Sequence, residues 1–311
     1  MERIDGFAHA LPFGFVDWMT AEHPSEALAA LAGSPQFWDV DRRLADLDEF
    51  GIDRQVIALG RPSILDGLSH DAALPAVRRA NDGIRALADE APDRLIPVGT
   101  LPFLTEDYLD EFDRCVDDLG LAGVQLFTVV DGQPIDDPAH RPVFERAVAQ
   151  DVPIWLHPRT LDWFDWPDEH GISKMFGWPF DTAVALVRLA IGGTLERFPE
   201  LTIVSHHMGG MVPHFSARIE SVAGAAGHDI DAVFDRLRGV LVDTALNGAD
   251  HALACGYDFY GADNVVFATD YPFGREGGRW FMRSCVRSVE ALDVTARDRR
   301  RIFGGNLAEV L

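Results

Sequence analysis

Lysine is almost absent from this sequence. Lys174 is the only lysine among 27 basic residues, and 50 acidic residues bring the formal charge to -23 at pH 7. A charge this negative argues against nucleic acid or an anionic membrane surface as a partner, because both repel an acidic protein. Neither is therefore expected to bind this chain.

An acidic composition with so little lysine also predicts a high-salt habitat, where counterions screen the self-repulsion of the protein. GC-rich codon usage is an alternative explanation for the missing lysine, but it does not explain the acidity. If the protein is halophilic, its melting temperature rises between dilute buffer and molar KCl in a thermal denaturation series. A melting temperature that stays flat or falls over this range would contradict the prediction.

Cysteine and long apolar runs are scarce too. Cys115, Cys255 and Cys285 are odd in number and far apart, which argues against a disulfide framework and a zinc ribbon and fits a reducing cytoplasm. The N-terminus has no apolar signal region, and the longest apolar stretch, residues 183–191, is interrupted by Arg188 and is too short to span a bilayer. We expect a cytoplasmic protein without a membrane span.

The sequence also lacks anything that divides it. No Ser/Gly linker, low-complexity block or fixed-period repeat occurs in the 311 residues, and 47% of them are hydrophobic, which is enough for one large core. We expect a single domain over residues 1–311.

What the sequence does contain is a regular alternation of short apolar segments and amphipathic segments. The apolar segments predict eight buried strands, over residues 2–9, 54–59, 95–100, 123–128, 153–158, 202–207, 240–244 and 265–270. Helices are expected over residues 38–50, 71–91, 105–118, 140–150, 180–197 and 278–311. This alternation predicts an α/β fold, a (β/α)₈ TIM barrel, rather than an open doubly wound sheet, because no G-x-G-x-x-G follows the first strand.

Long loops follow the first and the fifth predicted strands. Residues 10–35 are rich in Phe and Trp, and residues 160–178 contain Trp163, Trp166 and Trp178. Loops of this length directly after strands that end in histidine are expected to cover a site, although the tryptophan cluster can equally serve packing.

Four predicted strands end in side chains suited to metal binding or acid–base chemistry, namely His9, His157, His207 and Asp270. The carboxyl ends of barrel strands meet around one axis, so these side chains are expected to converge. Two imidazoles and a carboxylate can bind Zn²⁺ or a similar divalent ion and leave positions open for water and substrate. The structural alternatives are core histidines bonded to backbone and an aspartate that orders a loop.

The alternation of side chains along a strand gives each residue a face. Phe7 lies on the same face as the first-strand histidine, and Ser205 and His207 share one face of the sixth strand. His206 is therefore expected to point away from the site, with the alternative that His206 rather than His207 faces it. Asp243, which closes the seventh strand, is expected either to order a histidine or to order its own loop.

Seven motifs occur in order along nearly the whole chain. They are Ile-Asp-Gly-Phe-Ala-His (4–9), Trp38-Asp39, Gly51-Ile52-Asp53, His157, His-Met-Gly-Gly-Met-Val-Pro (207–213), Thr-Asp-Tyr-Pro-Phe (269–273) and Gly304-Gly305-Asn306. The set resembles the amidohydrolase superfamily, and within it the branch of aminocarboxymuconate semialdehyde decarboxylase and γ-resorcylate decarboxylase. Each motif alone is weak, whereas the ordered set is specific.

The resemblance implies a divalent metal held by His9, His157 and Asp270, with zinc as the first expectation and manganese or magnesium as alternatives. It also implies that His207 is the acid/base residue beside the metal, and that Asp270 shares in proton transfer if the reaction is a hydrolysis. Family members are often dimers, so a homodimer is implied as well.

One departure from the family concerns the metal. The family opens with H-x-H or E-x-H, whereas this chain has Phe7 at the first of these positions. Phenylalanine cannot ligate a metal, so at most three of the usual four ligands remain. This predicts weaker metal binding, a different ion or no ion.

A second departure concerns the substrate. The semialdehyde decarboxylase of the family grips a carboxylate with an arginine upstream of the Trp-Asp helix, but residues 10–41 contain neither Arg nor Lys. Arg61, Arg159 and Arg275 each follow a predicted strand and are the expected substitutes, because a guanidinium can bind a carboxylate in a bidentate manner. Alternatively, the substrate lacks that carboxylate.

Together these observations predict a metal-dependent barrel enzyme that decarboxylates a small aromatic or unsaturated carboxylic acid. A metal-dependent hydrolase of a lactone or amide is the first alternative. A metal-free isomerase or ligand-binding barrel is the second, because Phe7 replaces an expected ligand.

Overall fold

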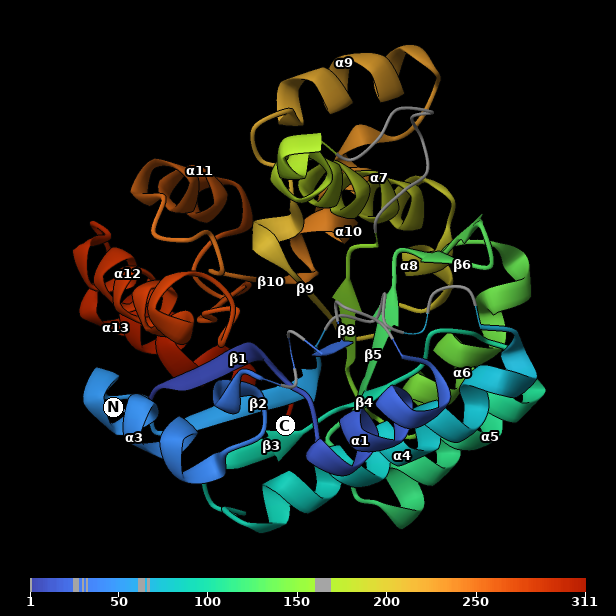
Figure 1. The fold of residues 1–311 in the computed structure, drawn as a ribbon. Helices are drawn as coiled ribbons and strands as arrows, with labels where there is room; N and C mark the ends of the chain where they lie inside the picture. Colours follow the sequence, from blue (N-terminus) through green and yellow to red (C-terminus); the bar gives the residue numbers. More distant parts are fainter. Residues whose placement is uncertain are drawn as a thin grey trace.

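A ring of parallel strands forms the centre of the molecule (Figure 1). The computed structural model describes residues 2–24, 28–29, 31, 33–60, 65, 68–159 and 169–311. Within these ranges the strands of the ring are β1 (Ile4–Ala10), β2 (Arg54–Leu59), β3 (Leu95–Pro97), β4 (Gly99–Thr100), β5 (Val124–Phe127), β8 (Ile154–His157), β9 (Ile203–Ser205), β10 (Leu241–Asp243) and β11 (Val265–Val266). Every predicted strand is therefore present.

Backbone hydrogen bonds close the ring. Parallel pairing joins β1, β2 and β3 in one run and β4, β5, β8, β9, β10 and β11 in another. One residue separates β3 from β4, so the two runs form a continuous wall. At the other end, the Gly6 N–H donates to the Phe267 carbonyl (2.8 Å) and the His9 N–H donates to the Tyr271 carbonyl (2.7 Å). The predicted (β/α)₈ barrel is confirmed.

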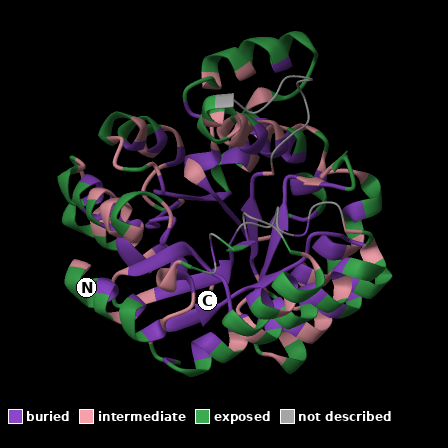
Figure 2. Cartoon of the chain, viewed as in Figure 1, coloured by how far each residue is buried: buried purple, intermediate pink, exposed green. Residues whose placement is uncertain are grey.

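Helices cover the outside of the ring, and Figure 2 shows buried strands inside a shell whose outer surfaces are exposed. The helices are α1 (Phe13–Glu22), α3 (Val40–Phe50), α4 (His70–Asp89), α5 (Glu106–Asp113), α6 (Arg141–Ala149), α7 (Trp178–Ile191), α8 (Thr194–Arg197), α9 (Ser216–Ala225), α10 (Ile230–Arg238), α11 (Asp250–Tyr260), α12 (Arg279–Ala291), α13 (Ala296–Arg300) and α14 (Asn306–Ala308). None of the described helices is both long enough and apolar enough to pass through a bilayer.

Short elements connect the strands and helices. They are the antiparallel pair β6 (Val129–Val130) and β7 (Gln133–Pro134), the 3-10 turns η1 (Pro35–Phe37), η4 (Pro138–His140), η5 (Glu169–Gly171), η7 (His207–Gly209) and η8 (Arg275–Gly278), and the π-helical turns η3 (Arg114–Asp118), η6 (Ser173–Gly177) and η9 (Arg301–Gly305).

Some predicted boundaries were wrong. The predicted loop after the first strand contains α1, which forms because Phe15, Val16 and Met19 bury one side of it. The predicted helix 180–197 is divided into α7 and α8 by two glycines, of which Gly193 has a positive φ of 85°. Helices α9, α10 and α11 were not predicted. Residues 160–168, with two of the three clustered tryptophans, lie outside the described residues.

Apolar side chains fill the interior of the ring. Phe7, Trp155, Val204 and Val266 belong to this interior cluster, and Phe7 and Trp155 are fully buried. The Trp155 indole N–H donates to the Gly6 carbonyl (2.8 Å), so one side chain ties β8 to β1 across the interior. This packed layer closes the barrel below the carboxyl ends of the strands.

A buried arginine on α3 holds the strands where the ring closes. The Arg43 guanidinium donates to the Gln55 side-chain oxygen (2.6 Å) and to the His9 carbonyl (2.7 Å). The Gln55 amide in turn donates to the Asp5 carboxylate (2.7 Å), which also accepts from the Thr269 hydroxyl (2.5 Å). One chain of hydrogen bonds therefore joins α3, β1, β2 and the segment after β11.

Replacing Arg43 with methionine is expected to lower the free energy of unfolding by about 3 kcal/mol. The substitution leaves two buried acceptors without donors, and each costs about 1–3 kcal/mol. Urea denaturation followed by circular dichroism measures the change, with the exposed neighbour Arg42→Met as the matched control. A loss within about 0.5 kcal/mol, the range of ordinary surface substitutions, would contradict the role of this arginine.

Candidate metal centre

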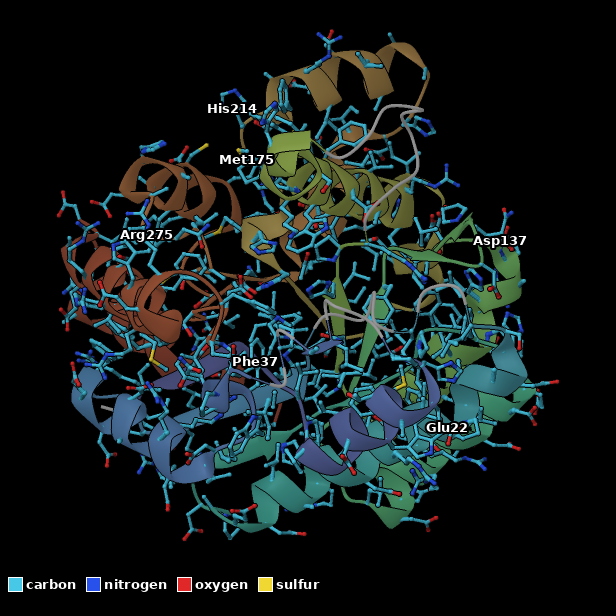
Figure 3. The ribbon with its side chains drawn as sticks, in the orientation of Figure 1. Glu22, Phe37, Asp137, Met175, His214 and Arg275 are labelled. Carbon is cyan, nitrogen blue, oxygen red and sulfur yellow. The ribbon has the colours of Figure 1, made fainter. Side chains whose placement is uncertain are left out.

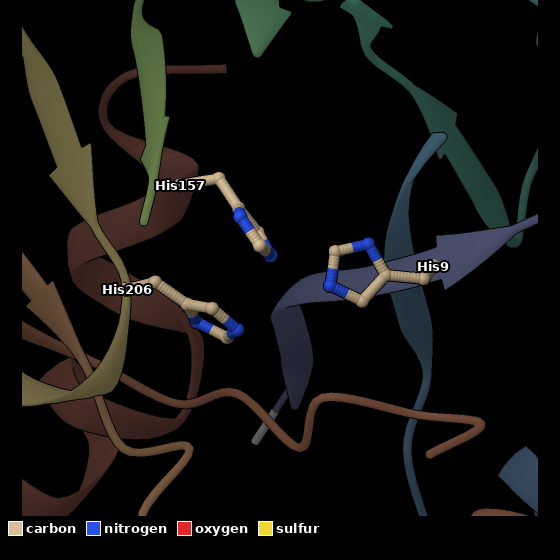
Figure 4. A group of neighbouring side chains, drawn as sticks. All are labelled: His9, His157 and His206. Atoms are coloured by element: carbon tan, nitrogen blue, oxygen red, sulfur yellow. The ribbon is translucent and has the colours of Figure 1, made fainter. Parts of the chain in front are cut away.

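Three histidines from separate strands point their imidazoles toward one another at the carboxyl end of the barrel (Figure 4). His9 lies in β1, His157 ends β8 and His206 follows β9. One ring nitrogen of each lies within 4.8 Å of the others, and all three side chains are buried. Trp155 and Val204 fill the barrel interior, so two positions later their strands again point inward, at His157 and His206.

Asp270 adds a carboxylate to this cluster. Its Oδ1 lies 3.3 Å from His9 Nε2 and 3.5 Å from His206 Nε2. The Asp270 backbone has a positive φ of 60°, and its N–H donates to the Phe7 carbonyl (3.1 Å), which fixes the turn that presents the carboxylate. His206, His207 and Asp270 form a second group whose ligand atoms lie within 4.8 Å of one another.

Hydrogen bonds on the far side of two rings set which nitrogen faces the cluster. His157 Nδ1 lies 2.6 Å from the Pro158 carbonyl, which can only accept, so Nδ1 carries the proton and Nε2 keeps its lone pair. His206 Nδ1 contacts the Asp243 carboxylate, which also accepts from the His207 backbone N–H (2.9 Å). The structure shows both roles expected for Asp243, because its carboxylate contacts His206 and also accepts from the Ala245 N–H (2.9 Å) of its own loop.

The inward nitrogens of the cluster face the Asp270 carboxylate but form no hydrogen bond among the described residues. His9 Nε2 and His206 Nε2 are buried and form no hydrogen bond with any described residue. Buried polar atoms are nearly always paired, and an unpaired one costs about 1–3 kcal/mol. Both atoms face Asp270 Oδ1, so imidazole nitrogens and a carboxylate oxygen converge on one point. This set of donors fits a divalent metal such as Zn²⁺ or Mn²⁺.

The electrostatics also favour a cation at this point. Burial opposes ionisation of Asp270, but contacts with His206 and His9 hold the pKa of its carboxyl far below the usual range. Burial likewise opposes protonation of His206, but Asp243 and Asp270 outweigh it and raise the His206 pKa to about 10. Without a metal, protonated His206 therefore carries the positive charge beside Asp270, and a metal bound here would replace its Nε2 proton. Burial and the adjacent histidines lower the pKa of His157, which keeps it in the neutral form that binds metals.

Phe7 occupies the position at which the family resemblance places a ligand. Its side chain is fully buried inside the ring, as the strand alternation predicts. The Phe7 ring stacks on the His206 imidazole, with centroids 4.1 Å apart and planes inclined by 20°. Its centroid is 5.6 Å from that of His9. The phenyl ring therefore supports the cluster by packing and supplies no ligand atom.

A cavity of about 690 Å³ adjoins the cluster. His207 and Asp270 line it beside His157 and His206, and its walls include the aromatic side chains of Trp178, Phe273 and Phe281. A polar end and aromatic walls suit a planar, charged small molecule.

The predicted arginines do not all reach this cavity. Arg159 lines it, together with Lys174. Arg275, labelled in Figure 3, is exposed and takes no part in the described lining. Its guanidinium carbon lies 5.7 Å from the centroid of the Trp280 ring. Arg61 lies outside the described residues.

The predicted orientation of His206 was wrong. The alternation from Val204 reaches His206 and places it inward, and it ends there, because His207 and Met208 have positive φ angles of 56°. Both His206 and His207 therefore line the cavity. Apolar Val204, two residues earlier, was the available signal for an inward His206. Lys174 was also missed, and its signal was its uniqueness in the sequence.

Comparison with known proteins gives a consistent result. A family model described as Amidohydrolase matches residues 4–311. The chain is similar to the 2-amino-3-carboxymuconate-6-semialdehyde decarboxylase of Dictyostelium discoideum, at 27% identity over 99% of this chain and 91% of the relative. It is similar to the γ-resorcylate decarboxylase of a Rhizobium species, at 29% identity over 85% of this chain and 86% of the relative. A solved 5-carboxyvanillate decarboxylase of Novosphingobium aromaticivorans with bound manganese matches with a TM-score of 0.83, at 26% identity over 99% of this chain and 96% of that one.

Proposed function

The chain belongs to the amidohydrolase family, and from this premise we propose that it is a metal-dependent decarboxylase of a small aromatic or unsaturated carboxylic acid. The observation that carries the proposal is the convergence of His9 and His157 with His206, and of Asp270 with His9 and His206, next to a cavity that His157 and Asp270 line. The relatives supply the chemical class, because all three are named as decarboxylases of such acids.

The cavity supports a substrate that is planar at one end and anionic at the other. Trp178 and Phe273 offer ring faces and edges against which an aromatic ring can pack. Arg159 and Lys174 bring positive charge to the same lining, and a carboxylate is the group they would bind. The overall charge of -23 makes these cations important, because the rest of the protein repels an anionic substrate.

The mechanism divides between a metal and the side chains. His9, His157 and Asp270 would hold a divalent metal, which would supply positive charge to offset the negative charge of the substrate. The aromatic walls align the ring and exclude water. The bond from the ring carbon to the carboxyl carbon breaks, its electron pair stays on the ring carbon, and His207 delivers a proton there while carbon dioxide leaves. His207 then regains a proton from solvent.

The geometry bears on both alternatives. A hydrolase of a lactone or amide would use the same cluster, but the relatives reported above are decarboxylases. A metal-free barrel would leave the buried His9 Nε2 and His206 Nε2 with the Asp270 carboxylate at 3.3 and 3.5 Å but without a hydrogen bond to any described residue. We therefore favour the metal-dependent decarboxylase.

Zinc is the metal we propose, with manganese as the alternative that the carboxyvanillate decarboxylase supports. Imidazole nitrogens with one carboxylate suit Zn²⁺, and Mn²⁺ accepts the same donors with additional oxygen ligands. Elemental analysis of protein purified from zinc- and manganese-supplemented cultures separates them.

The decisive test measures carbon dioxide and ring-opened acid in parallel. The purified protein is incubated with a panel of hydroxybenzoic acids, unsaturated amino acids and aryl lactones, first after dialysis against EDTA and then after addition of Zn²⁺ or Mn²⁺. We expect carbon dioxide release that EDTA abolishes and one of the metals restores. Ring-opened acid without carbon dioxide would support the hydrolase, and turnover that survives complete metal removal would contradict a metal-dependent reaction.

Replacing Lys174 with methionine is expected to raise KM for the carboxylic acid about tenfold and to leave kcat nearly unchanged. Lys174 is exposed at the cavity lining, so its contact with a carboxylate is worth about 1–2 kcal/mol. Steady-state kinetics measure the change. Arg275→Met is the matched control, because it also removes one exposed cation but lies away from the lining. Equal KM values for the two variants would contradict a substrate contact.

We further propose that the enzyme is a single-domain cytoplasmic protein that functions at high salt and forms a homodimer. The three cysteines are free, which supports a reducing compartment. Exposed Phe176 in η6, Phe180 in α7 and Phe215 just before α9 support a surface covered by a second copy. Light scattering at low and molar KCl measures the oligomeric state, and the melting series described above tests the salt requirement.

A further inference from the structure

Phe7 stands where the family resemblance places a metal ligand, and the chain carries a pair of adjacent histidines, His206-His207, after β9. We propose that His206 is the fourth metal ligand of this protein, entering from β9 in place of the side chain that Phe7 does not supply from β1. The inference rests on the proposed metal-dependent function and identifies how this chain completes its metal site.

The position of Phe7 makes the substitution of one ligand by another possible. Its ring lies against the His206 imidazole at a centroid distance of 4.1 Å, so the two side chains are direct neighbours inside the ring. A ligand from β9 therefore reaches the same region as a ligand from position 7. The nearly parallel stacking also limits rotation of the imidazole, which holds its inward nitrogen in one direction.

The partners of His206 are those of a metal ligand. Nδ1 contacts the Asp243 carboxylate, which is itself fixed by the backbone N–H groups of His207 and Ala245 (both 2.9 Å). Histidines that bind metals usually donate their other ring N–H to a carboxylate or carbonyl in this way. The opposite nitrogen, Nε2, is buried, forms no hydrogen bond with any described residue, and lies 3.5 Å from Asp270 Oδ1.

His206 also belongs to both groups of ligand atoms in the described chain. It converges with His9 and His157 in one group and with His207 and Asp270 in the other, each within 4.8 Å. His206 is the one histidine shared by the two groups. With His9, His157 and Asp270 it gives three imidazoles and one carboxylate, which restores a four-ligand set.

This assignment separates the two adjacent histidines by function. His206 follows the inward alternation of β9, whereas His207 lies in the turn after the strand, where its positive φ directs it to the cavity lining. His207 is then available for proton transfer and His206 for the metal. The pair performs two tasks that one histidine could not perform at once.

Metal affinity of matched variants tests the proposal. His206→Asn, Asp243→Asn and His207→Asn are compared with the unmodified protein by Zn²⁺ competition with a chromophoric chelator and by elemental analysis, with circular dichroism to verify folding. Loss of a group that supports a ligand typically weakens binding by about 10- to 100-fold, and we expect that range for Asp243→Asn. We expect a loss greater than about 100-fold for His206→Asn and little change for His207→Asn.

A rescue variant distinguishes the loss of a metal ligand from a general loss of folding. In Phe7→His/His206→Asn, the ligand returns to position 7, and we expect Zn²⁺ affinity at least tenfold above that of His206→Asn alone. X-ray absorption of the zinc-loaded unmodified protein counts imidazoles without any substitution, and we expect three. Two imidazoles, or full zinc affinity in His206→Asn, would overturn the proposal.

Failure of this inference is distinct from failure of the proposed function. A protein that releases metal-dependent carbon dioxide but shows two imidazoles at its zinc retains the function and loses the role of His206. A protein with three imidazoles at zinc and no decarboxylation of any acid retains the ligand assignment and loses the function.

Discussion

Replacing Asp270 with asparagine is expected to remove the bound metal and to reduce kcat at least about 10³-fold. The carboxylate lies 3.3 Å from His9 Nε2 and 3.5 Å from His206 Nε2, so it is the anionic member of the cluster. An amide of the same shape keeps the packing but loses the charge that attracts a divalent cation. Metal-ion catalysis contributes several kcal/mol to the transition state, and about 1.4 kcal/mol corresponds to each tenfold in rate.

The fold of this variant should persist, which makes the result interpretable. Burial disfavours the Asp270 carboxylate, so removing its charge relieves a desolvation cost at the same time as it removes contacts with two histidines. Asp131→Asn is the matched control, because Asp131 also pairs with a histidine, His70, at 2.9 Å, but at the surface. Elemental analysis and carbon dioxide release are measured on both variants. Stoichiometric metal in Asp270→Asn would remove Asp270 from the ligand set.

The barrel could be predicted because each buried strand leaves a local signature. Val265 and Val266, for example, belong to a β-branched apolar run that ends at Pro272 and Gly274, and such a run is typical of a strand buried on both faces. The length of that strand could not be predicted in the same way. Regular pairing with β10 stops at Val266, because the residues that follow bond to β1 and turn at Asp270.

The candidate site was only partly predictable for a related reason. His9, His157 and Asp270 could be grouped because barrel closure brings all strand ends together, whatever the exact register. The choice between His206 and His207 depends on a single-residue register, and a shift of one residue reverses the face of a side chain. The turn conformation of His207 and Met208 decides that register, and neither residue type predicts a positive φ.

Loop residues were the least predictable part of the site. Arg159 and Arg275 both follow predicted strands, yet only Arg159 lines the cavity. The difference lies in η8, where Glu276 and Gly277 have positive φ angles of 56° and 64° and the Arg275 guanidinium packs over Trp280. Such a turn depends on packing that a strand-end pattern does not contain.

The second large effect on kcat is expected from replacing His207, the proposed proton donor. Replacing His207 with asparagine is expected to reduce kcat about 10²- to 10⁴-fold, the usual contribution of a positioned acid or base, while metal content stays unchanged. His207 lines the cavity beside Asp270, and its Nδ1 has no hydrogen-bond partner among the described residues. An unpaired imidazole nitrogen at a cavity wall is free to exchange a proton with a bound molecule.

The charge state of His207 implies that the substrate takes part in protonating this histidine. Burial and the neighbouring His206 lower the pKa of His207 to about 3, so its imidazole is neutral at neutral pH before substrate binds. A substrate carboxylate brings a negative charge to the cavity and favours the protonated imidazole, because an opposite charge nearby raises the pKa of a histidine. We therefore expect His207 to gain its proton when the substrate carboxylate binds, which is the group that leaves as carbon dioxide.

Deuterium incorporation measures this role directly. In D₂O the unmodified protein is expected to release a product with one deuterium at the carbon that carried the carboxyl group, and His207→Asn should slow this product formation by the same factor as kcat. His214→Asn is the matched control, because His214 is an exposed histidine on the segment that follows (Figure 3). His207→Asn could instead bind metal normally and form deuterated product at the rate of the unmodified protein. The proton would then come from another group or from water, and His207 would line the cavity without acting as the general acid.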